Sequence, residues 1–171
     1  MTQTIAHVVN RLVIDTGNTF DDVRQRYESL VPTIDFAELV AVIQTGDLAR
    51  LQTYTAEHTP HSFAIYATLD VTPVMALSGH QRRAVTYLMG NNAIAETMFR
   101  HDPGIILYAP LRTAIYEDTP GHAQFSIDQP STKFASFDDP RIAEVGAQLD
   151  AKPADLLRHM SLPVPPELTT A

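Results

Sequence analysis

Cysteine is absent from the 171-residue chain. Its absence excludes disulfide bonds, thiolate nucleophiles, iron–sulfur clusters and cysteine-ligated zinc, and it fits a reducing compartment. Basic charge is also scarce, because 12 Lys and Arg residues stand against 20 Asp and Glu residues, for a formal net charge of −8. Counterion release from a phosphate backbone could contribute little to binding, so we expect no nucleic-acid partner.

Long apolar runs and recognised catalytic motifs are missing as well. No window of about 18 apolar residues occurs, and the first seven residues contain no basic segment that leads into an apolar one. We therefore expect a cytoplasmic protein without a membrane partner. No phosphate-binding glycine loop, dinucleotide fingerprint, nucleophile elbow or metalloprotease pattern is present, so we expect no cofactor and rank nucleotide hydrolysis and nicotinamide chemistry low.

The composition is that of a globular domain. Hydrophobic residues make up 44% of the chain and charged residues 19%, which is enough apolar surface to offset the entropy of ordering one compact core. We predict a single domain over residues 1–161. The proline-rich residues 162–171 form a tail that is ordered only if it docks on the domain.

Apolar periodicity and turn residues predict an alternating series of strands and helices. Runs rich in β-branched and aromatic residues predict strands at 8–15, 62–69, 83–89, 105–108, 112–116 and 123–127. Helical spacing and capping residues predict helices at 20–30, at 35–56 in two pieces broken at Gly46-Asp47, at 93–100 after an Asn92 cap, at 140–149 and at 152–160. The segment 71–79 fits neither pattern clearly.

Two clusters of basic or imidazole side chains allow both a structural and a functional interpretation. His58 and His61 could lie near a metal, but Pro60 prevents the regular helix that would align both rings, so we expect no metal site. Arg82 and Arg83 fit either a solvated strand entrance or an anion site.

Three further positions are candidates for a binding or catalytic site. His101 ends a predicted helix, where a cation complements the helix dipole, but it could also act as an acid or base. Asn91 lies beside Gly90 at a strand-to-helix junction, which suits either a cap or contact with a ligand carbonyl or anion. Arg112 shares a strand face with Tyr116, and on a buried face it would need Glu117, Asp128 or a bound anion as a partner.

The middle of the chain resembles a known family. The residues that carry the resemblance are Tyr87-Leu88-Met89-Gly90-Asn91, Asp102-Pro103, Ala109-Pro110-Leu111-Arg112, Tyr116-Glu117-Asp118 and Asp128-Gln129-Pro130. Their order resembles the bacterial and archaeal domain of unknown function 302, over residues 86–157 and more loosely over 11–30. The resemblance implies an α+β fold like that of the TATA-binding protein, with a curved antiparallel sheet, helices packed on one face, and frequent dimers. It implies no established reaction.

This sequence departs from the family pattern in three places. Asn92-Ala93 stands where the family usually has proline, Ile127 stands where an aromatic residue is common, and residues 33–61 look like a helical insertion. We expect the first half of this insertion to be helical and to cover the sheet, because its apolar residues would otherwise be exposed.

Three functions of different classes remain open. The first is binding of a small organic or apolar ligand in a pocket between sheet and helices, with Asn91, Arg112 and Tyr116 as ligand contacts. The second is a small enzyme without a tightly bound cofactor, in which His101 or Tyr108 moves a proton and Arg112 stabilises negative charge. The third is a structural homodimer or interaction module whose exposed sheet edge pairs with itself.

Overall fold

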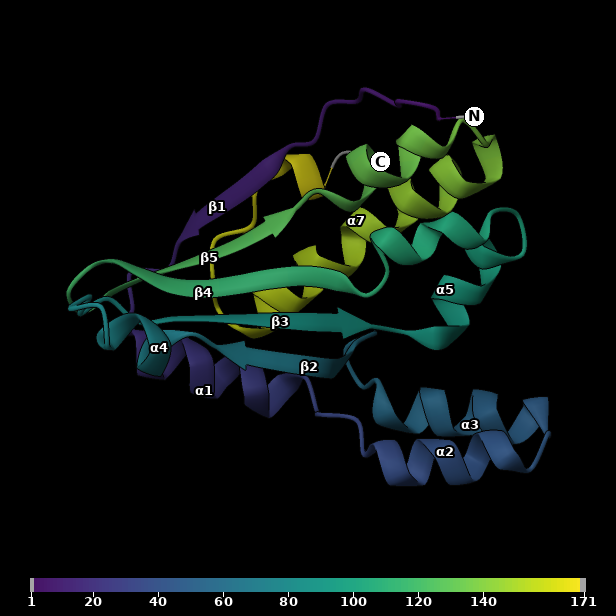
Figure 1. Cartoon of the computed structure of the whole chain (residues 1–171), viewed down its shortest axis with the longest axis horizontal. Coiled ribbons are helices and arrows are strands. Elements are labelled where there is room, and N and C mark those ends of the chain that lie inside the picture. The colour runs from purple at the N-terminus through teal and green to yellow at the C-terminus, as the bar shows by residue number, and fades with distance from the viewer. Residues whose placement is uncertain (1, 170–171) are drawn as a thin grey trace.

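The fold is built on one five-stranded antiparallel sheet with the order β1-β5-β4-β3-β2 (Figure 1). The computed structural model describes residues 2–169. The strands are β1 (Arg11–Asp15), β2 (Ala64–Asp70), β3 (Ala84–Gly90), β4 (Leu111–Thr119) and β5 (His122–Asp128). Apart from β4 and β5, which a turn joins directly, helices lie between strands that follow each other in the chain, and the architecture is α+β as predicted.

The longest helix is α7, with 20 residues, and the others are shorter. The α-helices are α1 (Phe20–Leu30), α2 (Phe36–Gln44), α3 (Leu48–His58), α4 (Thr72–Ala76), α5 (Asn92–Phe99), α6 (Pro130–Phe134) and α7 (Pro140–His159). Three 3-10 helices complete the set, at η1 (Pro103–Leu107), η2 (Ala135–Phe137) and η3 (Pro166–Leu168). None of these helices is long and apolar enough to cross a membrane.

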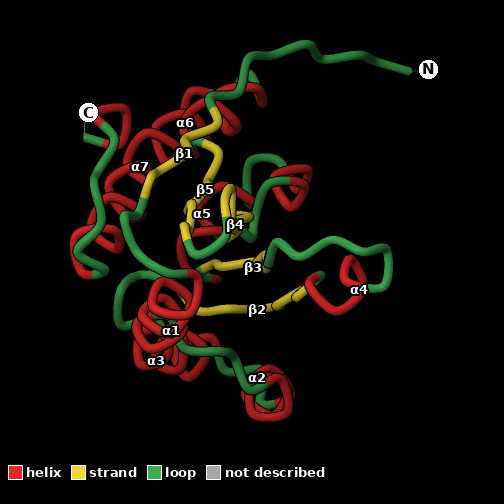
Figure 2. The backbone as a smooth tube through the Cα atoms, turned by 90° about the vertical axis from the view of Figure 1, so that its left-hand side faces the viewer, coloured by secondary structure: helices red, strands yellow, loops and turns green. Residues whose placement is uncertain are grey.

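One face of the sheet carries the main core. Alternate residues of the strands, such as Tyr87, Ile115 and Phe125, are buried in one cluster with Tyr27 of α1 and Leu157 of α7. Helices α1 and α7 lie on the same side of the strands (Figure 2). Because successive strand residues point to opposite faces, the other set of side chains lines an open face, and we use this term for that side of the sheet below.

Local sequence explains the start and end of α1. The Thr19 hydroxyl accepts a hydrogen bond from the Asp22 amide at 3.2 Å and so caps the helix. Phe20, Val23 and Tyr27 form the buried stripe, as their spacing predicts. The helix ends at Leu30, two residues before Pro32, in agreement with the sequence.

The insertion forms the predicted pair of helices, but it does not cover the sheet. Helices α2 and α3 lie beside one end of the sheet (Figure 1). They contact it through the start of β2, in a small second cluster that consists of Ile34, Leu39, Val42, Tyr54 and Ala64. Gly46 has a φ of +66° in the turn between them, a conformation that glycine adopts without strain. The expected cover fails because α2 is apolar on two sides and buries only one.

Two predicted elements are wrong. Residues 105–107 belong to η1, and Tyr108 caps its end, so residues 105–108 form no strand. The Asp102 carboxylate accepts from the Gly104 amide at 2.7 Å, and Pro103 starts a helical turn. The two helices expected around residue 150 are one continuous helix, α7, which runs through Pro153. A helical proline loses one backbone hydrogen bond, and here it is tolerated in a helix segment whose residues Leu156 and Leu157 are buried in the core.

Residues 162–169 of the C-terminal tail dock on the domain. Leu162 and Leu168 belong to the main core cluster, and Val164 packs against it. The sequence predicted order in the tail only if it docks, and these buried leucines show that it does; residues 170–171 of the predicted tail lie outside the described residues.

Candidate functional site

An apolar cavity lies where β3 and β4 meet α5 and η1. Its volume is about 330 Å³. The lining is mainly aliphatic and aromatic and includes Phe63, Tyr66, Ile94, Met98, Phe99, Ile105, Ile106 and Leu111. Gly90 lies in the wall, where a Cβ atom would come within 3.1 Å of the Pro110 Cβ. Glycine at this position therefore allows the end of β3 to approach the segment before β4 closely.

Asn91 is placed at the cavity, but its side chain is fully used in holding the structure. Its Oδ1 accepts from the amides of Ala93 and Ile94 at 2.9 and 3.2 Å and so caps α5. Its Nδ2 donates to the Thr59 hydroxyl at 3.2 Å and to the Ser62 carbonyl at 3.1 Å. Two accepted and two donated bonds are the whole capacity of an amide. The residue that caps α5 is therefore Asn91. The sequence had predicted Asn92 as the cap.

Asn92 and Tyr66 are the polar groups left available at the cavity. Within residues 2–169 the Asn92 side chain makes no hydrogen bond, and it lines the cavity at the start of α5. Burial raises the pKa of the Tyr66 hydroxyl to about 12, so it is a neutral phenol near pH 7. Sequence reasoning missed Tyr66, because it lies at a register irregularity of β2 that interrupts the alternation of that strand.

The other candidate residues do not gather at this cavity. Arg112 is exposed on the open face, and Tyr116 is half-buried on the same face, near the Ser126 hydroxyl at 3.5 Å. His101 follows α5, and its charge helps to lower the pKa of Asp139, whose largest perturbation comes from Arg141. None of these three residues lines the cavity. The structure thus does not bring His101, Arg112 and Asn91 into one site.

Tyr108 belongs to an aromatic cluster instead. Its hydroxyl lies 3.1 Å from His7 Nε2, and the Lys133 ammonium is 5.2 Å from the centre of its ring. Phe134 and Phe137 meet the ring edge to face. These contacts position Tyr108 as a packing residue.

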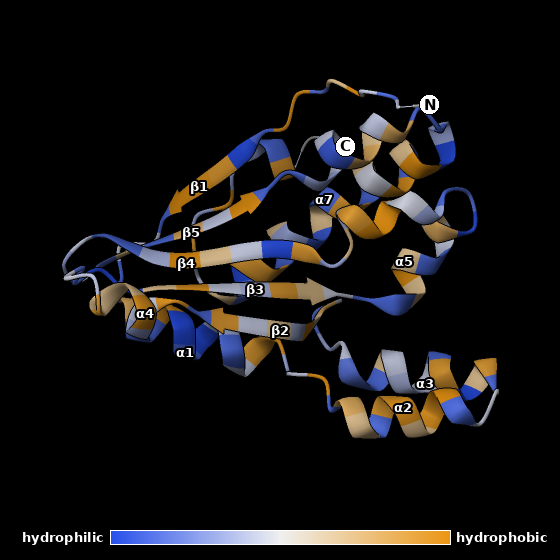
Figure 3. Cartoon of the chain, viewed as in Figure 1, coloured by the Kyte–Doolittle hydropathy of each residue, from blue (hydrophilic) through white to orange (hydrophobic). Residues whose placement is uncertain are grey.

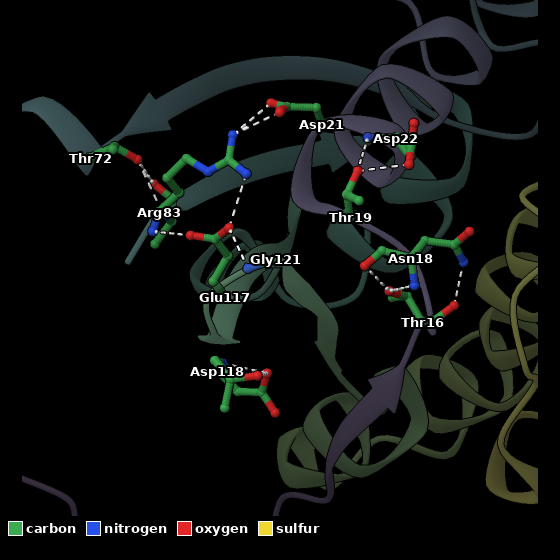
Figure 4. A network of polar contacts seen from close by, with 12 residues as sticks. Thr16, Asn18, Thr19, Asp21, Asp22, Thr72, Arg83, Glu117, Asp118 and Gly121 are labelled. Atoms are coloured by element: carbon green, nitrogen blue, oxygen red, sulfur yellow. Dashed lines mark hydrogen bonds and ion pairs between the residues drawn. The ribbon is translucent and has the colours of Figure 1, made fainter. Parts of the chain in front are cut away.

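Arg83 is the centre of an internal ion-pair network (Figure 4). Its guanidinium binds Asp21 at 2.8 Å and Glu117 at 2.9 Å, and its backbone amide donates to the second oxygen of Glu117 at 2.9 Å. Arg83 also holds the pKa of the Glu117 carboxyl below its ordinary value. Because both terminal nitrogens of its guanidinium already bind carboxylates, Arg83 does not form the anion site that the sequence left open.

The two histidines near residue 60, His58 and His61, contact different partners. His58 Nδ1 lies 2.8 Å from the Tyr54 carbonyl oxygen, whereas the His61 ring lies 4.4 Å from that of His159. Within residues 2–169 no group of three or more His, Cys, Asp or Glu side chains is placed to hold a metal ion. Absence of bound metal remains a prediction.

The sheet, its helical face and the cavity at one end define an α+β domain with a hollow of ligand size. The chain belongs to the family described as Domain of unknown function DUF302, whose model matches residues 48–160. The predicted resemblance is thereby confirmed, and the matched region begins at α3.

A solved structure is similar in fold. It is the crystal structure of an uncharacterized conserved protein DUF302 from Bacillus stearothermophilus, with a TM-score of 0.63 and 13% sequence identity, over 88% of this chain and 97% of that chain. At this identity the likeness concerns the fold alone. No curated protein matches the chain.

Proposed function

We propose that this domain binds a small, uncharged and mainly apolar organic ligand in the cavity between α5, η1 and the ends of β3 and β4. The observation that carries the proposal is the cavity itself, because about 330 Å³ with a predominantly apolar lining falls in the range of small-molecule sites. The curvature of the sheet expected from the TATA-binding-protein-like fold is part of the same proposal, since a curved sheet widens the space under its end.

Polar groups at the cavity favour a neutral ligand with one carbonyl or hydroxyl group. The Asn92 amide can donate and accept, and the Tyr66 phenol can do the same. Glu96 also lines the cavity, but it is paired with Arg100. No basic side chain lines the cavity, so an anionic ligand would find no cation among the lining residues. His101 and Tyr108 have no place in this proposal, because neither lines the cavity.

Filling the cavity tests the proposal. Ala95 lines it from α5, and we expect Ala95→Phe to abolish saturable binding of the neutral fluorescent probe N-phenyl-1-naphthylamine. Ala147→Phe is the matched control, because Ala147 is an exposed alanine inside α7 that lines no cavity described here. Equal affinity of both variants for the probe would refute the proposal, and native mass spectrometry of the purified protein would identify a ligand retained from the cell.

A homodimer is the second candidate function, and a specific surface favours it. Phe36, Val40 and Ile43 are 51%, 47% and 56% exposed and follow one another at helical spacing along α2, which is largely hydrophobic in Figure 3. A two-fold contact places a surface on a copy of itself. This uncharged stripe avoids the repulsion that acidic surfaces of a chain with net charge −8 would meet. We therefore place the interface on α2 rather than on a sheet edge.

Sedimentation equilibrium tests the dimer. Val40→Lys would introduce a charge into the centre of the stripe and shift a dimer to monomer. Ala41→Lys adds the same charge at an exposed position of α2 that lies outside the stripe, and it serves as the control. A wild-type protein that is monomeric at the highest concentration reached would refute this second candidate.

A further inference from the structure

A second hollow lies on the open face of the sheet, away from the apolar cavity. Its volume is about 270 Å³, and its lining includes Arg11 of β1, Arg112 of β4, and Ser126 and Asp128 of β5. No residue lines both hollows. The two sites are therefore separate in space and in chemistry.

The strand register brings the two arginines into one row. Arg11 pairs with Asp128 between β1 and β5, and Leu88 pairs with Arg112 between β3 and β4. Thr113 pairs with Ile127 in the antiparallel pair of β4 and β5, so the same register continued by one residue places Arg112 opposite Asp128. Neighbouring strands are 4.7–4.9 Å apart, so the Cα atoms of the two arginines are about 10 Å apart. Their long side chains can reach one ligand between them.

Both arginines keep their hydrogen-bond donors free. Within residues 2–169 four basic side chains make no hydrogen bond or ion pair, and two of the four line this hollow; the four are Arg11, Arg50, Arg112 and Lys152. Asp128, which lies between the arginines, is paired with Lys133 at 2.8 Å, and the Lys133 side chain is only 11% exposed. The Asp128 carboxylate is thus neutralised by Lys133, and the two arginines give the hollow an excess of positive charge on an acidic protein.

The floor of the hollow supplies another polar group. Ser126 is only 9% exposed, and its hydroxyl makes one contact, with the Tyr116 hydroxyl at 3.5 Å. Hydroxyl–hydroxyl bonds are usually 2.7–2.8 Å long, so this contact is weak. The Ser126 hydroxyl is therefore free to donate to a ligand.

We propose that Arg11, Arg112 and Ser126 form an oxyanion site that binds the carboxylate or phosphate group of a small molecule. The guanidinium fork matches both groups, because each presents two oxygens to parallel N–H donors. The small size of the hollow and the acidic surroundings select a small anion over a polyanion. The site is independent of the apolar cavity and does not rest on the function proposed for it.

Nuclear magnetic resonance titration of the ¹⁵N-labelled full chain tests the site. The probes are inorganic phosphate and succinate, each added at constant ionic strength against chloride. We expect saturable shifts at the amides of residues 11, 112 and 126 with at least one probe. The probe whose shifts saturate at the lower concentration shows whether the site prefers phosphate or carboxylate. Chemical shifts that grow linearly with both probes would overturn the proposal.

Variants separate a built site from general charge attraction. The double variant R11Q/R112Q should bind at least about tenfold more weakly, whereas R50Q removes an equally free arginine on α3 and should leave binding unchanged. R11K/R112K keeps the charge but loses the planar fork, so it should bind several-fold more weakly than wild type. Equal weakening by R50Q would overturn the proposal, and so would wild-type affinity in R11Q/R112Q. If R11Q/R112Q does not fold, R112Q alone gives the same comparison.

Discussion

Asp150 is the buried charged group on which several segments of this fold depend. It lies in α7 and is 5% exposed. Its Oδ1 accepts from the Ser131 amide at 2.9 Å, and its Oδ2 accepts from the Ser131 hydroxyl at 2.6 Å and from Gln129 Nε2 at 2.8 Å. These bonds hold the start of α6 against α7.

The network continues through Gln129 to both ends of the chain. Gln129 Nε2 also donates to the Glu167 carbonyl at 2.9 Å, and its Oε1 accepts from Asn10 Nδ2 at 2.9 Å. The orientation of the Gln129 amide is thereby fixed, because a flip would break the bonds to Asn10 and Glu167. Replacing Asp150 therefore cannot be compensated by a simple rotation of its neighbour.

We predict that Asp150→Ala lowers the free energy of unfolding by about 3–5 kcal/mol, since each hydrogen bond to a charged group contributes about 1.5–3 kcal/mol and such losses are not additive. Asp150→Asn should cost about 1–3 kcal/mol. The asparagine can still accept from Ser131, but its amide hydrogens would face the donors of Gln129. The two variants thus separate loss of the acceptors from loss of the charge.

Urea unfolding followed by circular dichroism measures these changes, and hydrogen exchange at residues 162–168 reports release of the docked tail. Asp155→Asn is the control, because Asp155 lies in the same helix with a side chain that is 59% exposed and paired only at the surface. It should cost under about 1 kcal/mol. If Asp150→Ala costs no more than this control, the reasoning from buried hydrogen bonds is refuted.

Three further changes have a predicted sign. Gly146→Ala should destabilise the fold by about 1–2 kcal/mol, because the new Cβ would lie 2.8 Å from the Phe134 Cβ. This clash should outweigh the usual gain in helix propensity. Thermal unfolding measures the change, and a variant more stable than wild type would refute this prediction. Arg83 lowers the pKa of Glu117 below 4.5. The stability that this ion pair gives the fold is therefore present above pH 4.5 and should be lost as the pH falls through the folded pKa. Urea unfolding midpoints should show this loss in wild type but not in Glu117→Gln. Asp118, with Asp15, raises the pKa of His122 above 6.5. The stabilisation that this pairing gives should therefore be lost as the pH rises from 6.5 through the folded pKa in wild type, but not in His122→Gln.

Local signals predicted most helices and strands, since the forces that set them act within a few residues. Thr19 caps α1 through its own side chain, and the break at Gly46 follows from a backbone conformation that glycine favours. The misplaced strand at residues 105–108 shows the opposite case. Its β-prone residues are overruled by the Asp102-Pro103 start of a helical turn and by tertiary contacts that bury Ile105 alone among them.

The position of the functional groups depends on contacts between distant residues, and sequence spacing does not reveal it. The availability of Asn92 rather than Asn91 follows only from the bonds that Asn91 makes to Thr59 and Ser62. Likewise, Arg112 keeps its hydrogen-bond donors available for a ligand because the neighbouring Asp128 is already paired with Lys133. Both facts require knowledge of which partner each donor has already found.

Strand β4 shows why one shared motif cannot define one site. Leu111 and Arg112 are consecutive, and successive residues of a strand point to opposite faces of the sheet. Leu111 therefore lines the apolar cavity, whereas Arg112 lines the hollow on the open face. A ligand in the cavity and an anion on the open face would contact neighbouring residues of the same strand through different sides of the sheet. Any coupling between them would have to pass through the backbone of β4, so binding of phosphate or succinate to the Ala95→Phe variant should remain intact if the two sites are independent.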